Sequence, residues 1–224
     1  MNKEKTSKYP ASFWYLIAIS VVEGGAVMAV ELLGAKLIAP SYGASLYVWA
    51  TTLAVTMGGL TTGYLIGGLV SEKYPHKLVL HYIVLASAIF VLLMPLTSSM
   101  VMSATLGLNL KLGIVITSMC FVFPPLVCFG MVSPLIIRLI SREVKEVGNS
   151  VGTIYSISTL GGIAATFLFG FFFIPEMGLT FSTYVTSFAL FSFPVYYFIR
   201  HRTFSLGQIK KEVKYSEKLH SQTA

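Results

Sequence analysis

The sequence predicts an all-α integral membrane protein with six transmembrane helices, and three observations support this fold class. Of the 224 residues, 55% are hydrophobic and only 11% are charged, which is far more apolar than a soluble domain of this length. The apolar residues form six segments, each near the roughly 20 residues that a spanning helix needs. The basic residues gather at alternate ends of these segments, a distribution that indicates an even number of crossings.

The six segments divide the chain into a short N-terminal segment (residues 1–12), a transmembrane domain (13–199) and a basic tail (200–224). The predicted spans are Phe13 to Leu33, Tyr47 to Val70, Leu78 to Thr97, Leu112 to Ile140, Val151 to Ile174 and Leu179 to Ile199. Turn-forming residues separate them at Pro40 to Gly43, Tyr74-Pro75, Ser98 to Asn109, Gly148-Asn149 and Pro175 to Gly178.

The orientation follows from lysine and arginine. Fourteen of the sixteen basic residues fall on one side of the predicted membrane, and only Lys36 and Lys111 fall on the other. The positive-inside rule therefore predicts a multi-pass protein of the cell (inner) membrane with both termini cytoplasmic. The net charge of +7 thus reports topology, and we expect contact with the lipid bilayer and no nucleic-acid binding. The basic tail is expected either to lie on anionic lipid or to dock a cytoplasmic partner.

Small residues recur every four positions in the second and fifth segments. The second carries Gly59, Gly63 and Gly67, and the fifth carries Ser158, Gly162, Thr166 and Gly170. Such stripes let helix backbones approach closely in lipid. They predict tight packing inside the bundle or, alternatively, a seam between two copies.

The first and fourth segments are interrupted near the middle of the membrane. The first carries Glu23-Gly24-Gly25, and the fourth carries Pro124-Pro125 and then Pro134. Prolines leave carbonyl groups of the preceding turn without donors, and in lipid such groups need protein or water beside them. Together with the glycine stripes, this pattern predicts two inverted three-helix repeats, as in one half of a major-facilitator transporter. A purely structural origin of the proline kinks stays open.

Two carboxylates lie in the first segment, Glu23 near its middle and Glu31 near its far end. An ionisable group at that depth faces protein or water and marks a pathway or a pairing partner. No lysine or arginine lies at a depth matching Glu23, so we expect it to meet a proton, water or a cationic substrate. Glu31 is the better structural anchor. The candidate substrate-binding residues are Glu23, Gly24, Gly25, Glu31, Pro124 and Pro125.

Two resemblances to known families follow from longer runs. The loop from Gly67 to Lys77 resembles the major-facilitator motif G-x-L-x-D-R-x-G-R-R, and implies a cytoplasmic latch made by Glu72, Lys73 and Arg138. The runs Glu31 to Trp49, Phe123 to Leu139 and Val151 to Ile163 resemble the membrane half of fused major-facilitator/spermidine-synthase-like proteins. In that family a Rossmann-like aminopropyltransferase domain follows, and these 224 residues do not contain one.

The sequence shows no catalytic constellation: there is no G-x-G-x-x-G after a strand, no metal-ligand cluster, and no nucleophile with a base nearby. The four histidines are scattered. We therefore expect no catalysis, cofactor or metal. Two functions stay open. The chain binds or moves a small cationic solute such as a polyamine, as a homodimer or with a second half-bundle. Alternatively, it is a non-catalytic membrane anchor or partner of a separately encoded, soluble spermidine-synthase-like enzyme.

Overall fold

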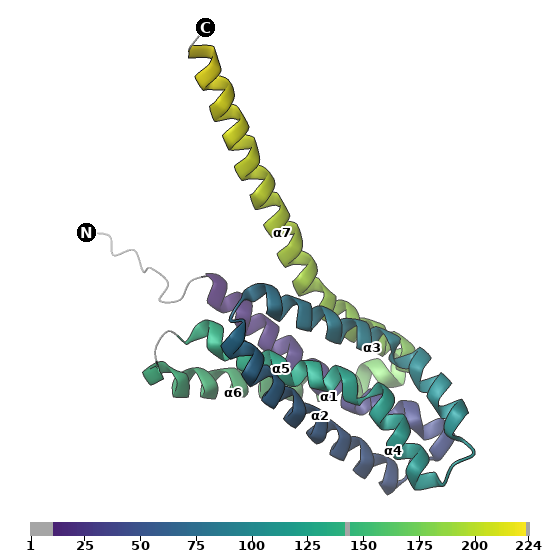
Figure 1. Cartoon of the computed structure of the whole chain (residues 1–224). Coiled ribbons are helices and arrows are strands. Elements are labelled where there is room, and N and C mark those ends of the chain that lie inside the picture. Colours follow the sequence, from purple (N-terminus) through teal and green to yellow (C-terminus); the bar gives the residue numbers. More distant parts are fainter. Residues whose placement is uncertain (1–10, 142–143, 223–224) are drawn as a thin grey trace.

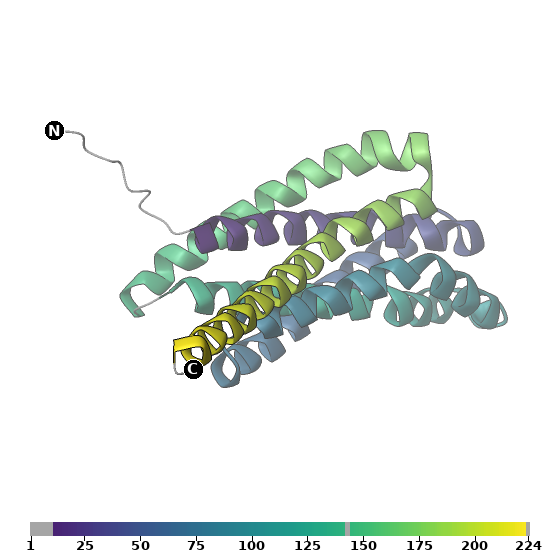
Figure 2. The ribbon, with the colours of Figure 1, turned by 90° about the horizontal axis from the view of Figure 1, so that it is seen from above.

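The computed structural model describes residues 11–141 and 144–222, which are helical apart from short turns (Figure 1). Along the chain the helices are α1 (Ala11–Tyr42), α2 (Leu46–Lys73), α3 (Lys77–Thr105), α4 (Leu110–Phe121), α5 (Phe123–Ile140), α6 (Val144–Leu168), the π-helix η1 (Phe169–Met177) and α7 (Leu179–Gln222). They pack side by side into one bundle, beyond which α7 continues (Figures 1 and 2). The all-α fold class is confirmed.

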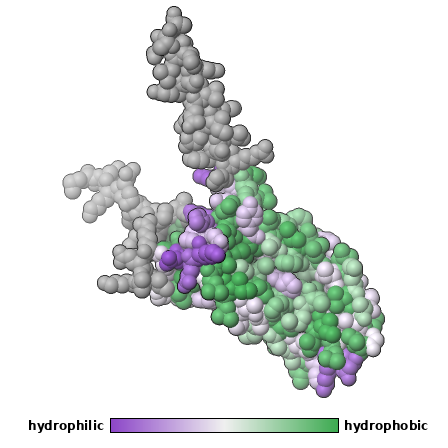
Figure 3. All heavy atoms as spheres, in the orientation of Figure 1, coloured by the Kyte–Doolittle hydropathy of each residue, from purple (hydrophilic) through white to green (hydrophobic). Residues whose placement is uncertain are grey.

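Five helical stretches of the described chain are long and apolar enough to cross a membrane. They are Phe13–Tyr42, Leu46–Lys73, Lys77–Thr105, Phe123–Ile140 and Ser150–Met177. Figure 3 shows an apolar surface over most of the bundle, with hydrophilic residues gathered toward its two ends. These features indicate a protein embedded in a membrane, with five candidate spans where the sequence predicted six.

The sixth predicted segment forms the first part of α7, which is not among the five. It is less apolar because it carries six serine and threonine residues, yet four of these side chains are buried. Each buried hydroxyl donates to a backbone carbonyl. Thr183 and Thr186 bond to carbonyls of α7 itself, Ser182 bonds to the carbonyl of Gly178 just before it, and Ser187 bonds to that of Ala88 on α3 at 2.8 Å. The hydroxyls are thus satisfied within the protein.

Several predicted boundaries were wrong. The first helix continues past Leu33 and through Pro40 to Tyr42, since one proline removes a single donor, and the chain turns only at Gly43, where φ is +79°. The third helix continues to Thr105. The turn predicted at Gly148-Asn149 does not exist, because α6 runs through it. The tail continues α7 as a helix to Gln222; its side chains, and the N-terminal residues 1–10, lie outside the described residues.

The predicted interruption of the fourth segment is confirmed. The helix divides at Val122 into α4 and α5, and Pro124 and Pro125 lie in the first turn of α5, where the missing N–H groups cost least. At this break α1 comes very close, since a Cβ added to Gly34 would lie 2.8 Å from a methyl group of Val122. Pro175, by contrast, lies inside the π-helical turn η1, which ends at Gly178 with φ of +82°.

Replacing both Pro124 and Pro125 with alanine is expected to straighten the α4–α5 junction, because the new N–H groups can bond to the carbonyls of Cys120 and Phe121. Thermal stability should hold or rise. Electron-spin distances between labels at the exposed residues Val115 and Arg138 should lengthen, in a background without the two native cysteines. An unchanged distance, with lower stability, would show that packing and not the prolines produces the break.

The glycine stripe of α2 packs inside the bundle, as predicted. Gly63 contacts Gly130 so closely that a Cβ on either residue would overlap the partner backbone, and Gly67 lies equally close to Met131. A second close crossing joins α1 to α6, where Gly24 meets the backbone of Ser158 and Gly161 that of Val21. These two crossings are the most extensive helix pairings of the bundle.

Candidate functional site

A cavity of about 350 Å³ lies between α1, α2 and α6. Its lining combines one carboxylate, two tyrosines, three hydroxyl residues and an apolar remainder. The residues are Glu23, Gly24, Val27 and Met28 of α1, Leu60 and Tyr64 of α2, and Tyr155, Ser158, Thr159, Gly162, Ile163 and Thr166 of α6. Tyr64, Tyr155 and Ile163 are also exposed on the outer surface, so the cavity is open on that side.

Glu23 is the charged group of this cavity and is only 4% exposed. Its Oε2 accepts a hydrogen bond from the Ser158 hydroxyl at 3.3 Å, which is its one hydrogen bond among the described residues. No lysine, arginine or histidine is among the lining residues. This buried carboxylate therefore has no cationic partner in the cavity lining, and this is the arrangement expected of a site that receives a proton or a cationic ligand.

The close crossing of α1 and α6 builds this site. Gly24 has no side chain to separate it from Ser158, so the Ser158 hydroxyl can reach the neighbouring Glu23. Gly162 similarly lies against Met28, where an added Cβ would come within 2.9 Å of the methionine Cγ. Gly24 was predicted from the sequence as a substrate-binding residue. In the structure it lines the cavity, and its role there is to let α1 and α6 pack closely.

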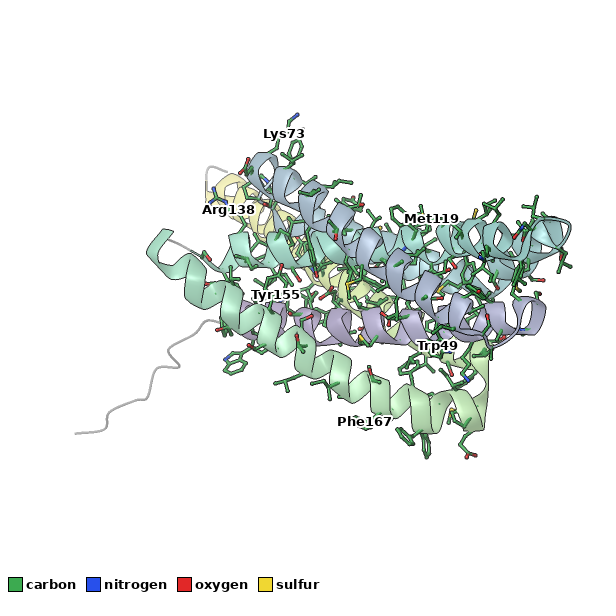
Figure 4. All side chains as sticks on the ribbon, turned by 90° about the horizontal axis from the view of Figure 1, so that it is seen from below. Trp49, Lys73, Met119, Arg138, Tyr155 and Phe167 are labelled. Atoms are coloured by element: carbon green, nitrogen blue, oxygen red, sulfur yellow. The ribbon has the colours of Figure 1, made fainter. Side chains whose placement is uncertain are left out.

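Two tyrosines, one from α2 and one from α6, line the same cavity as the carboxylate. The rings of Tyr64 and Tyr155 meet edge to face, with centroids 6.1 Å apart and planes at 76°. The hydroxyls of both lie within electrostatic range of Glu23. Figure 4 shows Tyr155 on α6. Sequence reasoning missed this pair, although a tyrosine in the middle of a span, such as Tyr64, is not explained by interfacial anchoring.

The other predicted substrate-binding residues lie outside the cavity lining. Gly25 packs against Ala165 and Gly161 of α6. Glu31 lies near Thr56 of α2, whose buried hydroxyl has no hydrogen-bond partner within the described ranges. Pro124 and Pro125 lie at the start of α5. The structure therefore places Glu23 and Gly24 in one site, and separates the remaining candidates from it.

The three predicted latch residues are all exposed on the surface. Lys73 and Arg138 lie toward the same end of the bundle (Figure 4), Lys73 at the end of α2 and Arg138 in the last turn of α5. The Lys73 amine lies 5.4 Å from the ring centroid of Tyr74. Glu72 has no ion pair with either base in the part of the chain that the structure describes.

A second polar cluster, which the sequence did not reveal, joins α1, α3 and α7. His81 is fully buried; its Nδ1 lies 2.6 Å from the Lys77 carbonyl and its Nε2 lies 2.8 Å from the Tyr15 hydroxyl. That hydroxyl also lies 3.0 Å from the Phe193 carbonyl. A carbonyl only accepts, so Nδ1 carries a proton. The Phe193 carbonyl also only accepts, so the single proton of the Tyr15 hydroxyl is used in the bond to Phe193. The Tyr15 oxygen can then bond to His81 only by accepting a proton from Nε2, which requires that Nε2 is protonated as well.

This cluster ties the bundle together at a position away from the Glu23 cavity. Tyr197 of α7 stacks on His81, with ring centroids 3.9 Å apart.

No group of three or more His, Cys, Asp or Glu side chains among the described residues could hold a metal ion. The chain matches no protein-family model, no curated protein and no solved structure.

Proposed function

We propose that this protein binds a small cationic solute at Glu23 and moves it across the membrane. The observation that carries the proposal is the buried Glu23 carboxylate in a cavity that holds no basic side chain. An acidic residue at the centre of a span costs about 2.5 to 3.5 kcal/mol on insertion scales. A cation that enters the cavity would offset this cost, since it supplies the missing counter-charge.

The helix pairings support a half-transporter architecture of two inverted repeats. In such repeats α1 corresponds to α4–α5, α2 corresponds to α6 with η1, and α3 corresponds to the first part of α7. When each helix is replaced by its counterpart in the other repeat, the α2–α5 pairing becomes the α6–α1 pairing. These are the two most extensive pairings, and the next, α3 with α7, maps onto itself. Such repeats place sites at their interface near the middle of the bilayer. In this arrangement α7 is the sixth span and both termini are cytoplasmic.

A single six-helix unit leaves the site incomplete. The cavity opens between α2 and α6, whose outer faces carry large exposed apolar side chains, Leu65 at 69% and Leu160 at 64% among them. A second copy, or another half-bundle, placed against these two helices would close the cavity and complete a path. The partner that the sequence predicts, a second copy or a second half-bundle, is therefore part of this proposal.

The test is counterflow in proteoliposomes that contain the full chain, with radiolabelled spermidine and tetraethylammonium as probes. Wild-type protein is expected to accumulate at least one labelled cation. Glu23→Gln should abolish accumulation while the protein stays folded, because the amide keeps the shape of the side chain and removes its charge. Glu31→Gln, the matched control on the same helix, should mainly lower thermal stability. Equal accumulation by the wild type and the folded Glu23→Gln variant would refute the proposal.

A further inference from the structure

The class of cation that the Glu23 cavity accepts follows from its size, its charge and its aromatic walls. This inference rests on the proposed function, since it assumes that Glu23 is the cation site. The cavity volume of about 350 Å³ lies in the range of sites for organic ligands. It is about ten times the roughly 30 Å³ that one water molecule occupies, so a bare metal ion or a proton would leave most of it empty.

The charge of the cavity sets the charge of the ligand. Glu23 is the one carboxylate in the lining, and Glu31 lies near α2 outside it. A polyamine brings several ammonium groups, and every group beyond the first would enter an apolar space without a counter-charge. A buried unpaired charge is strongly unfavourable. The cavity therefore matches a ligand with one positive charge.

The aromatic and apolar side chains of the lining determine which substituents the ligand can carry. Tyr64 and Tyr155 bring two aromatic rings to the same cavity as the carboxylate, and aromatic faces attract alkylated ammonium groups through cation–π contacts. Val27, Met28, Leu60 and Ile163 supply apolar surface. Beyond Glu23, the polar groups of the lining are neutral hydroxyls, and those of Thr159 and Thr166 donate to carbonyls of their own helix. They can accept a hydrogen bond from a ligand, but they supply no counter-charge to a second ammonium group.

We infer that the cavity binds a monovalent organic cation with apolar substituents, such as a quaternary or tertiary alkylammonium, and discriminates against polyamines. Glu23 supplies the counter-charge, the two tyrosine rings contact the substituents on nitrogen, and Ser158 holds the carboxylate in place. The class of substrate thus differs from the polyamine that the sequence resemblance implies.

The test measures equilibrium binding of radiolabelled tetraethylammonium to the full chain in lipid nanodiscs, with unlabelled spermidine as competitor. Spermidine should compete at least about tenfold more weakly than unlabelled tetraethylammonium. Tyr64→Leu and Tyr155→Leu should each weaken binding by about 5- to 30-fold, the range expected for a desolvated cation–π contact. Tyr64→Phe and Tyr155→Phe keep the rings and should weaken it by about threefold or less. Tyr82→Leu, on an exposed tyrosine of α3 outside the cavity, is the matched control.

Each outcome separates the inference from the proposed function. If spermidine binds more tightly than tetraethylammonium, or if the leucine variants bind as wild type does, the inference is overturned while a Glu23-dependent site remains. If neither cation binds in a Glu23-dependent manner, both fail. Should a leucine variant not fold, the spermidine competition on wild-type protein and the phenylalanine variants still decide the matter.

Discussion

Replacing Gly63 with alanine is expected to destabilise the bundle by about 3 kcal/mol, the upper end of the cost of overpacking a well-packed interior. The new methyl group would overlap the Val127 carbonyl of α5 and lie 2.7 Å from the Gly130 Cα. Backbone atoms in the middle of a packed helix cannot move away as a flexible side chain can. The two helices must therefore separate along their crossing. Thermal unfolding in detergent, followed by size-exclusion chromatography with fluorescence detection, measures the loss.

The same substitution at Gly58 or Gly68 is the matched control on the same helix. Neither position has an atom within 4 Å of an added Cβ, so alanine there should be neutral or stabilise by up to about 1 kcal/mol through its higher helix propensity. A Gly63→Ala protein as stable as these two would contradict the close α2–α5 crossing.

Replacing His81 with phenylalanine is expected to cost about 2 kcal/mol of stability. The phenyl ring keeps the stacking surface for Tyr197 but cannot bond to the Tyr15 hydroxyl, so a polar link between α1 and α3 is lost. His76→Phe is the control, because His76 is exposed at the start of α3 and its side chain makes no cap hydrogen bond.

A double-mutant cycle with Tyr15→Phe identifies the interaction. If the His81–Tyr15 bond carries the effect, the double variant should lose less stability than the two single variants together, by about 1 kcal/mol. Strict additivity of the two losses would show that each residue acts through other contacts.

Most of the helical framework could be predicted from local patterns. The glycine stripe of α2 and the prolines at 124–125 act through backbone sterics, which depend on few neighbours, and both predictions were confirmed. Gly148-Asn149 looks like a turn in isolation, but α6 continues through it. Pro40 likewise did not end α1. Helix ends depend on neighbouring structure as well as on local propensity, so short signals place them poorly.

The charged residue of the site could be predicted from the sequence, but the residues that surround it could not. Glu23 stands out because a carboxylate is rare in an apolar span. The other polar and aromatic residues of the lining, Ser158, Tyr64 and Tyr155, come from two other helices. Packing decides which faces of those helices meet α1, and for α6 the contact joins residues more than a hundred positions apart in the sequence. Glu31 shows the same limit. It was listed with Glu23 as a candidate substrate-binding residue, but it lies near Thr56 of α2 and outside the cavity lining.

The buried hydroxyls of α7 bear on how this protein enters the membrane during synthesis. A helix with six Ser and Thr residues in its first part partitions into lipid less readily than its neighbours. One of the buried hydroxyls, that of Ser187, donates to the Ala88 carbonyl of α3. The ribosome makes α3 long before α7, so this acceptor is already in the bilayer when α7 emerges. If α7 is the sixth span, as proposed above, its integration is expected to depend on the correct placement of α3, because the Ser187 hydroxyl finds its acceptor there.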